Sequence, residues 1–171
     1  MPFTSLKILS LSAMVGLVSS LDSNAMGVDG WYEQPALCGD TLVFASEGDL
    51  WIATLPDDGG ESSPVNAHRL TSGSGVESNP VLNADGSMVA YSASYDGNVD
   101  VYLMPTGGGA PTRLTHHPGR DVPVCFSANG RRVAFRSARS APQGNPTLYT
   151  VSLGGGLPKS AGFGPCSLAN F

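Results

Sequence analysis

The segment SNPVLNADGSMVAYSASYDGNVDVYLMPTGGGAPTRLTHHPG (78–119) decides the fold, because two other segments repeat its order of features. The first is QPALCGDTLVFASEGDLWIATLPDDGG (34–60) with AHRLTS (67–72), and the other is DVPVCFSANGRRVAFRSARSAPQGNPTLYTVSLGGGLPK (121–159). Corresponding positions lie about 44–51 residues apart. Periods of about 40–50 residues with four short strands per unit are typical of β-propeller blades. The sequence therefore predicts a chain of propeller blades.

Each repeat has the same local order. Asp-Gly or Asn-Gly turns at 83–86 and 128–130 precede a strand, because such turns accept positive φ. A second strand then leads to a glycine run, where a hairpin turn needs no side chain. The strands expected are 42–44, 89–91 and 133–135, then 49–52, 100–103 and 147–151, and finally 68–71 and 112–115, with glycine turns at 59–60, 107–109 and 154–156.

No helical periodicity of ten or more residues follows residue 25, so the fold class is all-β. We expect a β-propeller of four-stranded antiparallel blades over 26–159. Closed propellers have four to eight blades, and this length holds about three, at 31–72, 76–117 and 121–159. The ring is therefore expected to be incomplete, with an irregular tail at 160–171. Its unpaired sheet faces and edges would need remaining blades or an oligomer to cover them.

Residues 1–25 have the pattern of an export signal. Lys7 precedes the apolar stretch ILSLSAMVGLV (8–18), and Ser23-Asn24-Ala25 offers small residues before a cleavage site. The apolar stretch is shorter than the roughly 20 residues that span a bilayer. We expect a periplasmic or secreted chain with no membrane contact after signal cleavage. The alternative is a disordered or buried N-terminal helix.

Composition argues against nucleic-acid binding. The net charge is −5, from 9 Lys+Arg and 14 Asp+Glu, whereas phosphate backbones are bound by dense positive charge. The basic cluster Arg131, Arg132, Arg136 and Arg139 is interpreted as a solvated strand face and turn rather than a binding patch. Cys38, Cys125 and Cys166 form no C-x-x-C pair. We expect Cys38 and Cys125 to be small buried residues near strands, not a disulfide.

The sequence provides no catalytic, cofactor-binding or metal-binding residues. His116 and His117 follow an Arg-Leu-Thr triplet and are interpreted as loop residues, because few further ligands lie nearby. No serine lies in a Gly-x-Ser-x-Gly elbow, and no glycine run has a phosphate-loop ending. Asp49 and Asp100 recur at strand starts, where they would form local hydrogen bonds. Trp51, Tyr102 and Tyr149 recur as packing residues.

The repeat Pro-x-x…Asp-Gly-x-x-x-Ala-Tyr, Gly-Asn-x-Asp-Val-Tyr, Gly-Gly, Arg-Leu-Thr resembles that of TolB and of tricorn-type peptidases. GWYEQPALCGDTLVFASEGDLWIATLP (30–56), with 77–119, is similar to the first propeller of exported tricorn-like serine peptidases. This resemblance implies a noncatalytic N-terminal propeller segment that gates or channels peptides in proteolysis. It carries over no functional residue, because the peptidase core, which holds the nucleophilic serine, is absent from this sequence.

Two alternatives remain at this stage. One is a TolB-like periplasmic interaction module that binds protein partners through the propeller face, and the other is a truncated, nonfunctional remnant. TolB-type proteins place an α/β domain before their repeats, whereas the first repeat here follows the predicted cleavage site within about ten residues, which favours the peptidase family. The expected partners are peptides or proteins at the propeller face.

Overall fold

The computed structural model describes residues 31–57, 65–140 and 145–162. These residues form three antiparallel sheets, each a meander of four consecutive strands. Blade 1 contains β1 (Tyr32–Cys38), β2 (Thr41–Ser46), β3 (Asp49–Thr54) and β4 (Ala67–Arg69). Blade 2 contains β5 (Glu77–Leu82), β6 (Met88–Ala93), β7 (Asp100–Pro105) and β8 (Thr112–Arg113). Blade 3 contains β9 (Asp121–Phe126), β10 (Arg132–Ser137), β11 (Thr147–Ser152) and β12 (Lys159–Ser160).

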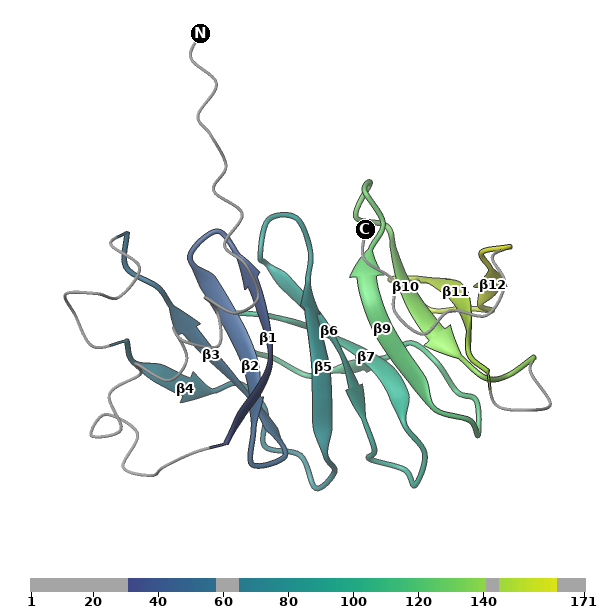
Figure 1. Cartoon of the computed structure of the whole chain (residues 1–171), viewed down its shortest axis with the longest axis horizontal. Coiled ribbons are helices and arrows are strands. Elements are labelled where there is room, and N and C mark those ends of the chain that lie inside the picture. The colour runs from purple at the N-terminus through teal and green to yellow at the C-terminus, as the bar shows by residue number, and fades with distance from the viewer. Residues whose placement is uncertain (1–30, 58–64, 141–144, 163–171) are drawn as a thin grey trace, which may run out of the picture.

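The three sheets stand side by side in chain order, as the blades of a propeller do (Figure 1). The first strands of the blades lie nearest to one another, since β5 contacts both β1 and β9. The last strands of blades 1 and 3, β4 and β12, lie at opposite ends of the picture (Figure 1). The predicted fold class is therefore confirmed: the described chain is a partial propeller of three four-stranded antiparallel blades.

The turns that precede the second strands form as predicted. Gly86 N–H donates to Asn83 O over 3.1 Å, and Gly130 N–H donates to Ser127 O over 2.8 Å. In both turns only the glycine takes positive φ, 71° at Gly86 and 66° at Gly130. The glycine runs at 107–109 and 154–156 connect β7 to β8 and β11 to β12, as hairpin turns.

Alternation along each strand sends side chains to both faces of a blade, and both faces are apolar. One core cluster fills the space between blades 1 and 2, and another fills the space between blades 2 and 3. The first cluster includes Val43, Leu50 and Ile52 from blade 1 with Val89, Tyr91, Tyr102 and Met104 from blade 2. The second includes Val101, Leu103 and Leu114 from blade 2 with Val133, Phe135, Tyr149 and Val151 from blade 3. Packing between blades therefore accounts for the apolar character of the strands.

Several expectations lie outside the described residues. These are the signal segment 1–25, the glycine pair 59–60 and Cys166. Strand β12 extends to Ser160, the first residue of the segment expected to be irregular, and residues 163–171 of that segment are likewise not described. Within the described ranges, no helix is long and apolar enough to cross a membrane.

Candidate functional site

The Arg-Leu-Thr triplets lie at the ends of blades 1 and 2 and contribute side chains to the junctions between blades. In blade 1, Arg69 Nε lies 3.3 Å from a carboxylate oxygen of Asp49, which begins β3. In blade 2, Arg113 Nη2 lies 2.5 Å from Asp100, which begins β7. The recurring aspartates thus form strand-start contacts, as expected, and each ties the third strand of a blade to the fourth.

The threonine of each triplet satisfies a buried backbone donor. Leu50 N–H donates to Thr71 Oγ1 over 2.8 Å, and Val101 N–H donates to Thr115 Oγ1 over 3.0 Å. The Thr71 hydroxyl in turn donates to the carboxylate of Glu77, the first residue of blade 2. An unpaired buried donor would cost about 1–3 kcal/mol. The threonine therefore links the end of blade 1 to the start of blade 2.

Each of the two junctions also holds a buried acid. Glu77 and Asp121 begin β5 and β9, and their backbone N–H groups donate to Gly48 O and Val99 O, each over 2.8 Å. Both residues are buried, with 1% of Glu77 and none of Asp121 exposed. Burial raises the pKa of the Asp121 carboxyl, because the charged form loses its water.

The partners of the two acids differ. Asp121 binds the guanidinium of Arg139, whose Nη2 lies 2.6 Å from Oδ2. Glu77 instead accepts a hydrogen bond of 2.6 Å from the hydroxyl of Tyr95. These partners are equivalent, because Glu77 pairs with Ala93 and Asp121 pairs with Ser137, and each partner lies two residues further along.

The two connectors between blades have the same length but carry side chains of different size. Residues 72–76 read Ser-Gly-Ser-Gly-Val, whereas the equivalent residues 116–120 read His-His-Pro-Gly-Arg. Gly73 is closely surrounded: a Cβ there would lie 2.4 Å from Tyr95 Cε1 and 2.7 Å from Glu77 Oε1. The backbone can approach Glu77 and Tyr95 this closely only because position 73 has no side chain.

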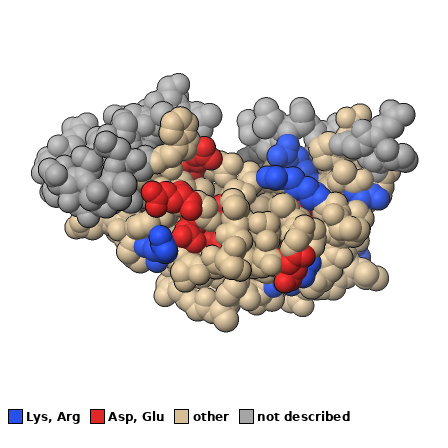
Figure 2. Space-filling view, turned by 90° about the horizontal axis from the view of Figure 1, so that it is seen from below, with Lys and Arg blue, Asp and Glu red and all other residues tan. Residues whose placement is uncertain are grey.

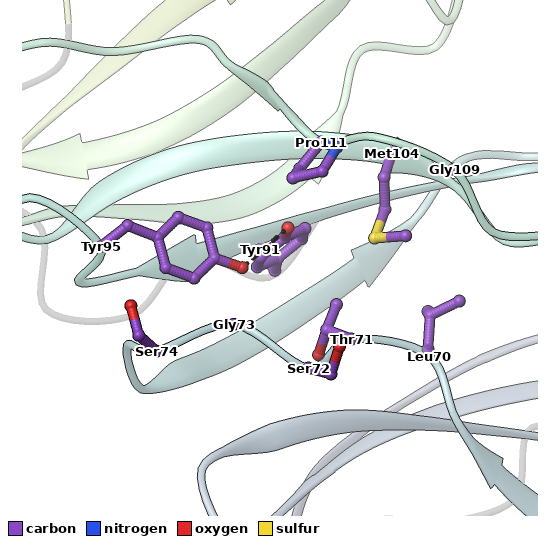
Figure 3. A pocket seen from close by; sticks show the side chains of 10 residues that line it. All are labelled: Leu70, Thr71, Ser72, Gly73, Ser74, Tyr91, Tyr95, Met104, Gly109 and Pro111. Atoms are coloured by element: carbon purple, nitrogen blue, oxygen red, sulfur yellow. Dashed lines mark hydrogen bonds between the residues drawn. The ribbon is translucent and has the colours of Figure 1, made fainter.

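A cavity of about 410 Å³ opens beside the small connector, and we name it the junction pocket. Its volume lies in the range of small-ligand sites. Figure 3 shows Tyr95 and Tyr91 on one side of the space, with the connector running past them. The lining residues are Leu70, Thr71, Ser72, Gly73, Ser74, Tyr91, Tyr95, Met104, Gly109 and Pro111.

A directed chain of hydroxyl groups runs along this pocket. Because the single hydroxyl proton of Tyr95 goes to Glu77, the Tyr95 oxygen accepts from the Tyr91 hydroxyl, 3.3 Å away. Burial raises the pKa of Tyr91 to about 12. It also raises the pKa of Tyr95, whose bond to Glu77 acts in the same direction. The chain therefore stays protonated at neutral pH and leaves acceptor capacity on the Tyr91 oxygen.

A second cavity, of about 290 Å³, is lined in part by Glu77. Trp31 is 78% exposed there and donates from Nε1 to Glu33 Oε1 over 2.6 Å. Figure 2 shows most of the acidic side chains toward the blade 1 side of the viewed face, and most of the basic ones toward the other side. The cavity is lined by Trp31, Glu33, Ala45, Ser46, Glu47, Gly48, Val76, Glu77 and Ser78.

The histidine pair lies in the connector between blades 2 and 3. His117 N–H donates to Asp100 Oδ1 over 3.3 Å, and its carbonyl accepts from Asn98 over 2.8 Å. Its ring Nδ1 accepts from Gly119 N–H over 2.9 Å. These bonds shape the loop. In the part of the chain that the structure describes, no three His, Cys, Asp or Glu side chains group to hold a metal.

Two other expectations need correction. Arg139 is not a solvated strand-face residue, because only 15% of its side chain is exposed and it pairs with Asp121. Cys38 and Cys125 are free thiols, as expected, but both are half-buried rather than buried. The recurring aromatic residues do pack, with Tyr102 and Tyr149 in the two inter-blade clusters and Trp51 against the outer face of blade 1.

Comparison with known proteins gives a family. Residues 29–171 match the model of the tricorn protease N-terminal β-propeller domain. Tricorn protease homolog 1 of Streptomyces coelicolor is 30% identical over 128 residues, 74% of this chain and 11% of that protein. The Tol-Pal system protein TolB of Helicobacter pylori is 38% identical over 73 residues, 43% of this chain and 17% of TolB. The chain spans about a tenth of the length of the Streptomyces homologs that it matches.

A solved structure agrees in fold. The crystal structure of the tricorn protease superposes with a TM-score of 0.70 and 21% identity, covering 84% of this chain and 14% of that one.

Proposed function

The chain belongs to the family of tricorn protease N-terminal β-propeller domains, and on that premise we propose that it is a noncatalytic propeller segment that gates or channels peptides in proteolysis. The observation that carries the proposal is the junction pocket, an open cavity of about 410 Å³ between two blades of a propeller from this family. It has backbone, hydroxyl and apolar groups along its wall, and such a mixture of apolar surface and a few polar groups is typical of binding sites.

Peptide binding is tested with the full chain and fluorescein-labelled peptides from digested casein. Saturable binding by fluorescence anisotropy, with the peptides intact by mass spectrometry, is the expected result. An anisotropy that stays flat up to millimolar chain would refute peptide binding. Robust cleavage of the peptides would refute the noncatalytic role.

Gating is tested by adding the chain to a tricorn-type peptidase from the same organism. We expect the ratio of cleavage rates for short and long peptides to change when the chain is present. An unchanged ratio at saturating chain would contradict gating while leaving peptide binding intact.

A TolB-like interaction module is the second candidate, and the 38% identity to TolB over 73 residues favours it. This candidate expects a folded protein, not an extended peptide, as the partner. Binding of a purified folded partner with no binding of any casein peptide would support it over the peptide role.

We also propose that the chain is periplasmic or secreted, on the basis of the segment at 1–25. The mature N-terminus should then be Met26 in the exported fraction of expressing cells. Recovery of the chain in the cytoplasm with residues 1–25 attached would contradict export.

A further inference from the structure

A buried acidic residue, Glu77, lies behind the wall of the junction pocket without lining it. Glu77 accepts hydrogen bonds from the hydroxyl groups of Thr71 and Tyr95, and both of these residues line the pocket. Two hydroxyl donors suit an ionised carboxylate, which has only acceptors. Among the described residues, no arginine, lysine or histidine forms an ion pair with Glu77. The carboxylate is therefore stabilised by hydroxyl groups alone.

At the junction of blades 2 and 3, the equivalent acid is paired with a cation. Arg139 places its guanidinium 2.6 Å from Asp121, the equivalent of Glu77. The guanidinium carbon also lies 5.1 Å from the ring centre of Phe135 and 5.0 Å from that of Tyr149, within cation–π range. One acid and two aromatic rings thus surround one guanidinium.

Blade 2 repeats this acid and this pair of rings without the guanidinium. Strand register makes Tyr91 equivalent to Phe135 and Tyr102 equivalent to Tyr149. Tyr95 stands at the position of Arg139, and its ring packs edge-on against Tyr102 with centroids 4.8 Å apart. Blade 2 therefore keeps the acid, and among the described residues the hydroxyl of Tyr95, not a guanidinium, binds it.

The pocket wall offers acceptors to a donor-rich group. The hydroxyl chain runs from Tyr91 through Tyr95 to Glu77, so each hydroxyl points its proton toward the carboxylate. Lone pairs on the Tyr91 oxygen, and the hydroxyl groups of Ser72 and Ser74, are then left for a ligand. A guanidinium has five N–H donors and no acceptor, so it complements this wall.

We propose that the junction pocket binds the arginine side chain of a peptide, whose guanidinium lies against the hydroxyl groups that separate the pocket from the Glu77 carboxylate. Leu70, Met104 and Pro111 would pack against the three methylene groups of that arginine, as apolar surface does for long cationic side chains. This inference rests on the proposed peptide-binding function and names the residue that the peptide presents.

The test compares two peptides that differ in one charge. An acetylated, amidated hexapeptide with one central arginine is titrated into the full chain, alongside the same peptide with citrulline, which has the same shape without the charge. We expect arginine to bind at least tenfold more tightly at low salt, with the difference shrinking as salt is raised. Equal affinities would overturn the inference and leave the peptide role standing. Binding of neither these peptides nor the casein peptides would refute the proposed function itself.

Two variants locate the site. Glu77→Gln should reduce the arginine peptide to the affinity of the citrulline peptide. Because this change may destabilise the junction, Ser74→Arg serves as a second variant: it lies on the exposed connector and places a guanidinium of the chain at the pocket. It should abolish the preference for arginine, whereas Ala84→Arg, on a distant exposed turn, should retain it. A preference kept in both Glu77→Gln and Ser74→Arg would overturn the assignment to this pocket.

Discussion

Arg139 and Asp121 form an ion pair at the junction of blades 2 and 3, with Nη2 and Oδ2 2.6 Å apart and the carboxylate fully buried. Arg139 comes from the segment after β10, whereas Asp121 begins β9. The pair therefore fixes the first strand of blade 3 against the turn that follows its second strand. At this junction, a buried acidic side chain is thus stabilised by direct pairing with a basic one.

Replacing Arg139 by leucine should destabilise the chain by about 3–5 kcal/mol, because it leaves a buried carboxylate without its cation. Urea denaturation followed by circular dichroism measures the change. Adding Asp121→Asn to the leucine variant should restore part of the loss. Arg120→Gln, at an exposed connector position, is the control and should stay within about 0.5 kcal/mol of the parent. A leucine variant as stable as the parent would mean that the pair contributes nothing net.

Thr71→Val should lower the free energy of unfolding by about 1–3 kcal/mol, since it leaves the Leu50 N–H without an acceptor and removes a donor from Glu77. The substitution nearly preserves side-chain volume, so packing changes little. Thr112→Val, at an exposed position of β8, is the matched control. If both variants unfold at the same urea concentration, the threonine of the triplet has no special role.

Gly73→Ala should cost about 1–3 kcal/mol, because the added methyl would overlap Tyr95 and Glu77. Thermal unfolding measures the loss. Gly107→Ala provides the control, because a Cβ there meets no atom within 4 Å. A Gly73→Ala variant that melts with the parent would show that the connector moves away from Tyr95 without cost.

Stability should fall at alkaline pH as Tyr91 ionises. Its folded pKa, raised to about 12, lies above the ordinary tyrosine pKa of about 10, so the folded state holds the proton more tightly. The stability linked to this group is fully present below about pH 10 and is lost as the pH rises through about 12. Denaturation midpoints between pH 8 and 12 should therefore decline less in Tyr91→Phe than in the parent. Parallel declines in the two proteins would contradict this linkage.

The repeat made most of the fold predictable. The spacing of the Arg-Leu-Thr triplets and of the aromatic strands indicated the blades, and the Asp-Gly and Asn-Gly pairs marked turns that the structure contains. These signals are local, because turn chemistry and strand alternation depend on residues close in sequence.

The junction pocket could not be predicted in the same way. In the sequence, Glu77 is an acid that precedes a strand like others in the chain. The small residues at 72–75 indicate a loop and no pocket. The available signal is an alignment of the two eight-residue segments 70–77 and 114–121, since Leu-Thr begins both and an acid ends both. The sequence places Arg139 in a basic cluster, and no local pattern shows that it pairs with Asp121, 18 residues earlier in the chain.

The sequence by itself determined the all-β class, the order of strands within a blade and the recurrence of Asp, aromatic and Arg-Leu-Thr positions. These features follow from short-range patterns repeated along the chain. Only the tertiary structure decided which acid gained a cation and which was left to hydroxyl groups. That outcome depends on contacts between strands, because the pairing of β5 with β6 brings Glu77 to Tyr95, and the end of blade 1 brings Thr71 to Glu77 at the start of blade 2.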